Sequence, residues 1–332
     1  MMGEEVERQP KIVTHDDFDG VVSAALVSRA LGVDCFVFAG PRTIAESRIT
    51  ITSQDIVCDL PYPLECGMWF DHHEGNLEEL RYRGIDPATL AGSFALRDSC
   101  ARVVYEYFRP RGCFPDFYEE TVGEADVLDS FRFASIEEWR KPTPGKMVDA
   151  AIKAQEGSPR ERSAFLRRLV RQVRDLPLGE VASTEEICRA YEEYHRQEEE
   201  MLQVIARQAR FLPGDEGQEM VVLDFTDYAR PPRVIKKLAF LLYPQAKAVL
   251  EVRNLMRGGL KTTDLSVSMS LGINLPGQGH GKDVGEIMRS LNIGDGHAGA
   301  AAGTVYCASK AEMLRAKEKL LAQILALWRA QQ

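Results

Sequence analysis

The sequence predicts an α/β protein: a doubly wound, mainly parallel sheet in the N-terminal domain, then a helical connector and a smaller α/β C-terminal domain. In the first third of the chain, short β-branched runs alternate with stretches of helical periodicity, which is the order typical of parallel sheets. The length of 332 residues suits two domains. We place the boundaries at residues 1–182, 183–214 and 215–332.

The N-terminal domain is expected to build its sheet from four strands. A helix at 20–31 follows the first strand and ends at Gly32, because glycine is a common residue at helix C-termini. From residue 93 onward the pattern turns helical. The expected strands cover residues 11–15, 34–39, 55–59 and 68–71, and the later helices cover residues 99–108, 117–128 and 160–176.

A long polar helix from residue 183 to about residue 211 is interpreted as the connector, and His195 on it as a surface histidine. The C-terminal domain is expected to mix strands and helices. A glycine-rich turn at 277–282 is by itself a weak signal for an anion site. The expected strands cover residues 220–225, 246–253, 264–271 and 304–308, and the helices cover residues 233–242, 284–291 and 310–327.

Composition limits the partners of the chain. The formal net charge is −9, which argues against a general surface for duplex nucleic acid, because such a surface needs clustered Lys and Arg. The arginine-rich helix at 160–176 is read as a solvated face. Contact with nucleic acid is the alternative for this helix, although no aromatic residues are interleaved to stack on bases.

Cysteine usage and the apolar runs indicate a cellular location. The seven cysteines contain no C-x-x-C pair, which is typical of free thiols in a reducing compartment. The first residues are acidic where a signal peptide would be basic. No run approaches the roughly 20 apolar residues of a membrane span. We therefore expect a cytoplasmic protein without a membrane partner.

A dense group of acidic and imidazole side chains directly follows the first expected strand. Side chains alternate along an extended chain, so His15, Asp17 and Asp19 face one side and Asp16 faces the other. Carboxylates this close repel one another unless a cation lies between them. Oxygen and imidazole ligands suit Mn²⁺, Fe²⁺, Zn²⁺ or Mg²⁺. The alternative is an acidic turn that caps the next helix.

Two further strand ends supply side chains of the same kind. Asp59 ends the strand expected at 55–59, and Asp71, His72 and His73 follow the apolar residues of the next strand. The carboxyl ends of parallel strands meet at one edge of a sheet, where open α/β folds bind their ligands. The sequence therefore predicts a site at this edge.

These motifs resemble those of the DHH phosphoesterase superfamily. The order is H-x-D-x-D-G, then a lone aspartate at a strand end, then D-H-H. The short H-x-D spacing is similar to that of the exonuclease-like and some nanoRNase-like branches. For the fourth motif of the family we expect Asp129, because residues 129–133 fit D-[ST]-x-x-F. Asp126 is the alternative.

The resemblance extends to the C-terminal domain. Residues 294–303 are similar to the G-G-G-H-x-x-A-A-G signature of the DHH-associated domain found in nanoRNase and exopolyphosphatase-related proteins. Two departures stand out: Asp295 replaces the middle glycine, and one extra small residue precedes Gly303. Both could alter how this loop approaches a phosphate or a sugar.

The resemblance implies two divalent ions, with Mn²⁺ as the first choice and Mg²⁺, Co²⁺ or Fe²⁺ as alternatives. Two such ions can activate a water and stabilise the leaving oxygen during in-line attack on phosphorus. Asp59 would bridge the ions. The implied ligands are His15, Asp17 and Asp59 for one ion, and Asp19, Asp59, His72 and Asp129 for the other.

The resemblance also implies roles for other residues. His73, together with Asp17 and Asp19, is expected to be catalytic, with His73 facing the phosphate as a cationic donor or an acid. Asp16 and Asp71 are expected to orient histidines. The site is expected in a cleft between the domains. The residues expected to bind substrate are His73, Gly294, Gly296, His297 and Arg253.

The function implied by this resemblance is a metal-dependent phosphoesterase that hydrolyses short single-stranded oligonucleotides or nucleotide phosphates. One alternative is an exopolyphosphatase or pyrophosphatase that cleaves phosphoanhydrides. Another is a non-catalytic relative that binds a nucleotide, which the altered glycine loop would mark. The chain is compatible with a homodimer.

Overall fold

The computed structural model describes residues 9–155, 157–273 and 281–331. The chain divides into two compact units: the first comprises residues up to Arg132 and Arg140–His195, and the second Phe133–Trp139 and the residues from Arg196 onward. Most of the glycine-rich turn expected at 277–282 lies outside the described residues. Within the described ranges, no helix combines the length and the apolar character needed to cross a membrane.

The first unit contains a sheet of five parallel strands, which confirms the predicted fold class. Its order is β2-β1-β3-β4-β5. The edge strand β5 was not expected, because the sequence was read as helical from residue 93. Its three residues include only one strong strand former, so its pattern is weak. The strands are β1 (Ile12–Thr14), β2 (Phe36–Phe38), β3 (Ile56–Cys58), β4 (Met68–Asp71) and β5 (Gly92–Phe94).

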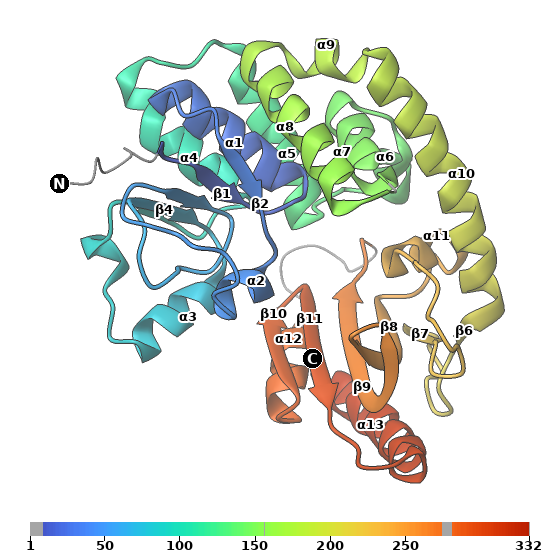
Figure 1. Ribbon diagram of the computed structural model, residues 1–332. Helices are drawn as coiled ribbons and strands as arrows, with labels where there is room; N and C mark the ends of the chain where they lie inside the picture. Colours follow the sequence, from blue (N-terminus) through green and yellow to red (C-terminus); the bar gives the residue numbers. More distant parts are fainter. Residues whose placement is uncertain (1–8, 156, 274–280, 332) are drawn as a thin grey trace. The chain divides into compact units, whose positions relative to one another are not determined.

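Both faces of this sheet are covered, because successive strand residues enter two different cores (Figure 1). Ile12 and Phe70 belong to the core on one face, whereas Val13 and Trp69 belong to the core on the other. The second face is covered by α2 (Pro41–Ala45) and α3 (Glu74–Tyr82). The first face is covered by α1 (Phe18–Leu31), α4 (Cys100–Phe108), α5 (Phe117–Ser130), α7 (Pro144–Ala154), α8 (Pro159–Asp175) and α9 (Leu178–Ala182).

Helix α1 connects the first acidic loop to this core. Asp17 is its N-cap, and Gly32 ends it with a left-handed φ of 71°. Every residue from Phe18 to Ser28 is buried, as expected for a helix packed between a sheet and other helices. The start of α1 is therefore fixed by packing as well as by its cap.

The arginine-rich helix α8 places its apolar side in the same core. It begins with a capping box in which Ser158 and Glu161 satisfy each other's backbone amides. Phe165, Leu169 and Val173 lie on its buried side. Most of its arginines pair with acidic groups of the first unit, for example Arg171 with Asp34 at 2.8 Å.

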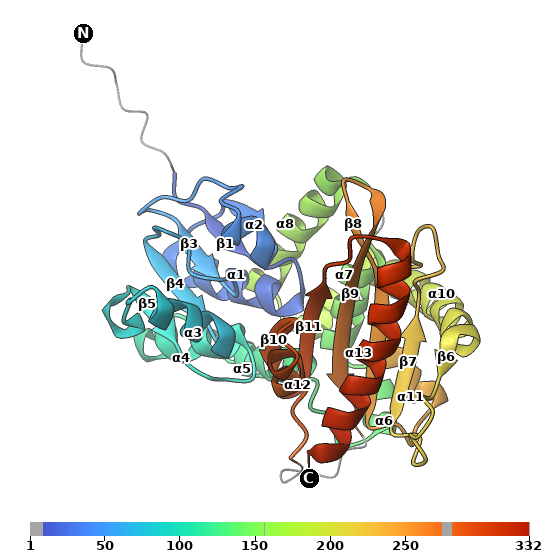
Figure 2. The ribbon, with the colours of Figure 1, turned by 90° about the horizontal axis from the view of Figure 1, so that it is seen from below.

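The second unit contains a sheet of six strands in the order β10-β11-β9-β8-β7-β6, in which only the β7–β8 pair is parallel. Helices α12 (Val284–Ser290) and α13 (Lys310–Ala330) cover one face (Figure 2). The strands are β6 (Ala209–Arg210), β7 (Met220–Asp224), β8 (Ala248–Arg257), β9 (Leu260–Leu271), β10 (Gly294–His297) and β11 (Ala300–Val305). Helix α10 (Glu185–Gln208) leads into this unit, and the short α6 (Ile136–Arg140) precedes it in the chain.

Three expectations for the second unit were wrong. The last strand is β11 at Ala300–Val305 rather than 304–308, and β10 was read as a loop. Both errors arise because glycine and alanine are poor strand formers, so pairing across the hairpin decides the structure here. The helix expected at 233–242 is reduced to a 3₁₀ turn at Lys236–Leu238 and the short α11 (Ala239–Leu242).

We expect a buried ion pair to stabilise the start of β1 and β3. Lys11 Nζ lies 3.0 Å from Asp55 Oδ2, and the carboxylate also accepts hydrogen bonds from the amides of Lys11 and Thr52. Burial alone would raise the pKa of Asp55, but these bonds outweigh it and lower the pKa. At pH 7, Asp55→Asn should reduce the free energy of unfolding by about 3 kcal/mol, because it leaves Lys11 buried without a counter-charge.

The sign of the pH dependence follows from the lowered pKa. The contribution of Asp55 is complete above the ordinary aspartate pKa and is lost as the pH falls through the folded-state value. Urea unfolding between pH 7 and pH 3 should show the difference between wild type and Asp55→Asn shrinking. The control is Asp34→Asn, an exposed partner of Arg171, which should cost about 1 kcal/mol or less. Equal losses in both variants would contradict the prediction.

Candidate metal centre

The first group of candidate ligands comes from the loop after β1 and from the residue after β3. His15 Nδ1 lies 2.6 Å from Asp17 Oδ2 and 3.7 Å from Asp59 Oδ2. Asp17 Oδ1 also accepts a hydrogen bond of 3.0 Å from the amide of Gly20, which fixes this carboxylate at the start of α1. The three side chains offer ligand atoms within 4.8 Å of one another.

Asp59 holds an unusual backbone conformation at the end of β3. Its φ is 56°, in the left-handed region that residues other than glycine rarely adopt. Such a conformation costs about 1–3 kcal/mol and persists where the surroundings enforce it. The turn buries the carboxylate so that Oδ2 lies toward His15 and Oδ1 lies 3.6 Å from His72 Nε2. Asp59 is therefore shared by two groups of ligands.

The second group consists of Asp19, His72 and Asp129, again with ligand atoms within 4.8 Å. His72 Nε2 lies 3.8 Å from Asp19 Oδ2 and 3.4 Å from Asp129 Oδ2. His72 Nδ1 is 3.1 Å from the carbonyl oxygen of Arg97. Because a carbonyl can only accept, Nδ1 carries the proton and Nε2 keeps its lone pair for the group of carboxylates.

Asp19 is held by the N-terminus of α4. Its carboxylate accepts hydrogen bonds of 2.7 Å from the amide of Cys100 and 2.8 Å from the amide of Ala101. These amides have no partner within the helix, and the helix dipole favours a negative charge there. The sequence indicated Asp19 as a ligand, but it gave no sign that the start of a helix some eighty residues away would orient it.

The electrostatics of the two groups fit bound cations. Burial is the largest cause that raises the pKa of Asp19 and Asp59 well above the ordinary value, and the charges of neighbouring aspartates add to it. Among the described residues, Asp59 Oδ1 and His72 Nε2 are buried without a hydrogen-bond partner. Buried polar atoms normally have one. Carboxylate and imidazole donors of this kind suit divalent transition metals and Mg²⁺, so the residues present fit such ions.

Helix α5 carries both candidates for the fourth motif, and their different contacts distinguish them. Asp129 lies beside the imidazole of the second group. Asp126 is instead engaged by Arg102, whose Nη2 lies 2.7 Å from its Oδ2, and by Ser99 Oγ at 2.7 Å. Ser99 caps α4, the helix whose first amides bind Asp19. Asp126 therefore does not contact the second group directly. It binds the cap of the helix whose first amides hold Asp19.

His73 lies at the edge of these groups and is about half exposed. Its Nδ1 is 2.9 Å from Asp71 Oδ1, and Asp71 Oδ2 accepts a hydrogen bond of 2.7 Å from Asn76 in α3. Burial lowers the pKa of His73, but the bond to Asp71 and nearby carboxylates outweigh it and raise the pKa to about 9. The sequence suggested that Asp71 orients a histidine, whereas no motif pointed to Asn76.

The glycines of the C-terminal signature build a hairpin in the second unit. Gly294 pairs with Gly303 across β10 and β11. A Cβ at Gly294 would lie only 2.0 Å from the carbonyl oxygen of Ala302, so the close approach of the strands requires glycine there. His297 ends β10 and is exposed, and its Nδ1 accepts a hydrogen bond of 3.1 Å from the amide of Gly299.

Asp295, which replaces the middle glycine of the signature, pairs with an arginine of the same unit. Arg289 Nη1 on α12 donates to Asp295 Oδ1 at 2.8 Å and to the carbonyl oxygen of Gly296 at 2.9 Å. Burial raises the pKa of Asp295, but the bond from Arg289 outweighs it and lowers the pKa. The aspartate thus ties the hairpin to α12. Arg289 was not singled out from the sequence.

The basic residues of β8 and β9 are engaged separately. Arg253 Nε lies 3.2 Å from Glu251 Oε1, and Arg257 Nη2 lies 2.9 Å from Asp264 Oδ2. Lys261 Nζ donates to the carbonyl oxygen of Thr226 at 2.6 Å. Arg253, the one expected to bind substrate, therefore has an acidic neighbour on its own strand.

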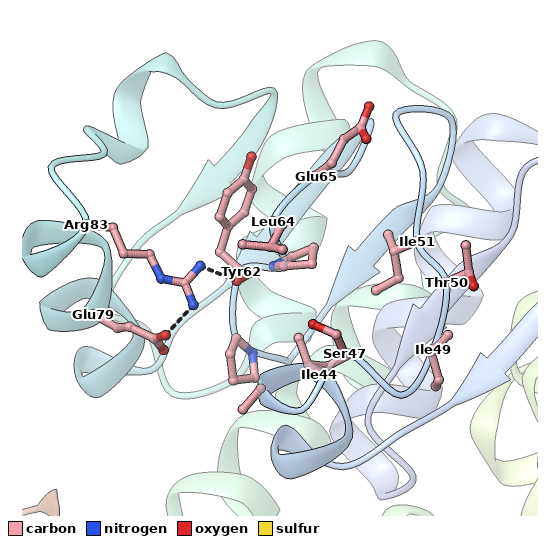
Figure 3. Close-up of a pocket in the computed structure, with 13 residues that line it drawn as sticks. Ile44, Ser47, Ile49, Thr50, Ile51, Tyr62, Leu64, Glu65, Glu79 and Arg83 are labelled. Carbon is pink, nitrogen blue, oxygen red and sulfur yellow. Dashed lines mark hydrogen bonds and ion pairs between the residues drawn. The ribbon is translucent and has the colours of Figure 1, made fainter.

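A pocket of about 390 Å³ lies elsewhere in the first unit, next to α2 and α3 (Figure 3). Ile44, Ile49 and Ile51 line one side, and Tyr62 and Leu64 line another. None of the residues expected to hold metal or substrate is among those that line it. This pocket is separate from the two groups of candidate ligands.

Comparison with known proteins gives results from solved structures alone, because no family model and no curated protein matches the chain. A pGpG-specific phosphodiesterase, PggH from Vibrio cholerae, matches with a TM-score of 0.68 and 22% identity over 96% of this chain and 99% of that chain. The DHH domain of a protein described as a member of a ribosomal protein family matches with a TM-score of 0.61 and 12% identity, over 96% and 86%. The chain has the DHH-domain fold. The resemblance read from the motifs is thereby confirmed at the level of the fold.

A further match is RecJ in complex with Mn²⁺ from Thermus thermophilus, with a TM-score of 0.51 and 14% identity. It covers 96% of this chain but only 52% of RecJ, so RecJ is the longer protein. The likeness therefore concerns about half of RecJ.

We expect Gly20 to be indispensable for the geometry of the first ligand loop. A Cβ at this position would lie 2.3 Å from the carbonyl oxygen of His15, so Gly20→Ala must push the loop away from α1. The variant should lose about 1–3 kcal/mol of unfolding free energy and bind Mn²⁺ at least tenfold more weakly in calorimetric titration. The control is Gly123→Ala in α5, where no atom lies within 4 Å and stability should rise by up to about 1 kcal/mol. Similar effects of both changes would refute this account.

We expect Asp59→Asn to weaken metal binding and to raise the stability of the metal-free protein. Asparagine tolerates the left-handed backbone, and the change removes one of several buried like charges. The metal-free variant should therefore melt at a higher temperature than the metal-free wild type. Mn²⁺ at 100 times its dissociation constant should stabilise the wild type by about 2.7 kcal/mol and leave the variant unchanged. Thermal melts with and without Mn²⁺ test this, and equal Mn²⁺ shifts in both proteins would contradict it.

Proposed function

We propose that the protein is a metal-dependent phosphoesterase that hydrolyses short single-stranded oligonucleotides or nucleotide phosphates. The observation that carries the proposal is the position of Asp59 between two ligand groups at the carboxyl edge of the parallel sheet. Asp59 belongs to the group of His15 and Asp17, and its Oδ1 lies 3.6 Å from His72 Nε2 of the other group. Two unpartnered buried polar atoms in these groups support it, because they are aimed at the same small space. Both features lie within the first unit.

The proposed ligands follow from the two groups. Divalent ions bound there would supply Lewis acidity toward a phosphate and lower the pKa of a bound water. Mn²⁺ is our first choice, with Mg²⁺, Co²⁺ or Fe²⁺ as alternatives. The ligands would be His15, Asp17 and Asp59 for one ion, and Asp19, Asp59, His72 and Asp129 for the other.

The remaining residues of the proposed site would bind the substrate phosphate or orient the side chain that binds it. Asp71 holds Nδ1 of His73, so the exposed Nε2 edge is presented to a phosphate oxygen, where it can donate a hydrogen bond. Asn76 fixes Asp71 in turn. The burial of Asp19 and Asp59 strengthens the electrostatic interactions that these carboxylates would make with bound ions.

The substrate class rests on three considerations. The net charge of −9 suits a small anion held locally rather than a long nucleic acid. PggH, which has the highest TM-score among the solved structures described above, is described as a pGpG-specific phosphodiesterase. In the second unit, Gly294, Gly296, His297 and Arg253 are proposed to contact the substrate. We place 5′-phosphorylated dinucleotides and short oligonucleotides first among the substrates.

Asp129→Asn should abolish hydrolysis, whereas Asp126→Asn should impair stability more than turnover. The reason is that Asp129 lies in the second ligand group and Asp126 pairs with Arg102. With Mn²⁺ and a panel of pGpG, tri- to pentanucleotides, adenosine bisphosphate, cyclic dinucleotides and polyphosphate, we expect pGpG and short oligonucleotides to react fastest. We expect Asp129→Asn to lose at least about 10³-fold of that rate, about 4 kcal/mol of barrier.

The control for this experiment is Glu120→Gln, an exposed carboxylate on the same helix α5. Its rate should stay within twofold of the wild type. Faster hydrolysis of polyphosphate than of any oligonucleotide would favour the phosphoanhydride alternative. Binding of pGpG without release of mononucleotides in the presence of Mn²⁺ would overturn the enzymatic proposal.

A further inference from the structure

Arg162 on α8 contacts the first ligand loop, the residues after β1 that carry His15 and Asp17. Its Nε donates to Asp16 Oδ2 at 3.1 Å, and its Nη2 donates to the carbonyl oxygen of Asp16 at 2.9 Å. Nη1 donates to the carbonyl oxygen of Ile152, at the end of α7, at 2.9 Å. One guanidinium thus joins α7, α8 and the loop after β1 through three hydrogen bonds.

Asp16 stands between two candidate ligands in the chain. His15 and Asp17 belong to the first ligand group, and Arg162 binds Asp16 between them. Because the guanidinium grips both the side chain and the peptide carbonyl of Asp16, the rotation of this peptide unit is fixed. The directions of the neighbouring His15 and Asp17 side chains depend on it, because both residues are joined to Asp16 in this short loop.

Arg162 also holds a carboxylate that lies near a candidate ligand. Asp16 Oδ1 lies 3.8 Å from His15 Nε2, and the Asp16 side chain is 42% exposed. The bond from Arg162 Nε to Asp16 Oδ2 fixes the orientation of this carboxylate beside the imidazole. The planar fork of arginine suits this task better than lysine, because it can bind a side-chain oxygen and a carbonyl at once.

The other arginines of α8 make a useful contrast. Arg168 pairs with Glu186, and Arg171 pairs with Asp34, both at exposed positions of the first unit. Neither pair involves the loop after β1. Exposed pairs of this kind contribute little to stability. Arg162 is distinguished by its two contacts to a residue of the ligand loop.

We propose that Arg162 is a positioning residue of the metal centre, which holds the peptide of Asp16 so that His15 and Asp17 are aligned to bind a divalent cation. This inference rests on the proposed metal site. Groups that orient metal ligands from outside commonly change metal affinity by 10- to 100-fold when they are removed. From the sequence, the helix at 160–176 was interpreted as a solvated face and Arg162 was not singled out, because its partner lies 146 positions away in the chain.

The test compares Mn²⁺ binding by isothermal titration for the wild type, Arg162→Met, Arg162→Lys and the matched control Arg168→Met. We expect Arg162→Met to bind Mn²⁺ about tenfold more weakly. Arg162→Lys should lie between it and the wild type, because lysine keeps the charge but loses the fork. Arg168→Met should bind as the wild type does. Melting of the metal-free proteins checks that all four are folded.

A double variant tests whether Arg162 acts through Asp16. Asp16→Ala removes the side-chain bond and leaves the carbonyl contact, so it should weaken Mn²⁺ binding less than Arg162→Met does. Arg162→Met combined with Asp16→Ala should be no weaker than Arg162→Met alone. In hydrolysis assays, Arg162→Met should need more Mn²⁺ for half-maximal rate while kcat at saturating Mn²⁺ stays within about twofold. A residue with a purely structural role would not produce this separation.

Different results would overturn different statements. If the wild type binds Mn²⁺ and folded Arg162→Met and Arg162→Lys bind it within twofold as tightly, the positioning role is wrong and the proposed function stands. A loss in Arg168→Met equal to that in Arg162→Met would also refute it, because the effect would then belong to α8 as a whole. If the wild type does not bind Mn²⁺, the proposed function fails and this inference fails with it.

Discussion

The main constraint on the first unit is that several negatively charged carboxylates are buried close together. Asp19 and Asp59 are almost fully buried and lie near further carboxylates, an arrangement that water cannot screen. The parallel sheet produces this arrangement, because the ends of β1, β3 and β4 meet at one edge. Elements outside the sheet then hold individual carboxylates: the N-terminus of α4 binds Asp19, and the amide of Gly20 in the first turn of α1 binds Asp17.

Support for these charges extends outward in a second layer of contacts. Arg102 and Ser99 connect Asp126 to the start of α4, and Asn76 connects α3 to Asp71. These contacts are made to Asp126 and Asp71, which are neighbours of the candidate ligands and are not proposed to bind metal. The helices on both faces of the sheet therefore do more than cover a core, since their backbone amides and side chains orient several of the candidate ligands and their neighbours.

Much of the site could be read from the sequence because its ligands are short-range features. His15, Asp17 and Asp59 directly follow β-branched runs, so the period of a strand was enough to place them at one edge. The contact of Arg162 and the choice between Asp126 and Asp129 depend on helices that pack far from the motifs in sequence. The strands β5 and β10 were missed for another reason: their glycines carry no strand preference, and pairing alone defines them.

The left-handed backbone conformation of Asp59 limits which amino acids can occupy this position. Aspartate, asparagine and glycine are the residues that accept such a backbone most readily, yet only aspartate brings a charge that both ligand groups can share. In the genetic code, asparagine and glycine are each one nucleotide change from aspartate. A chain that keeps this fold but lacks the charge shared by the two groups of candidate ligands is therefore a single point mutation away.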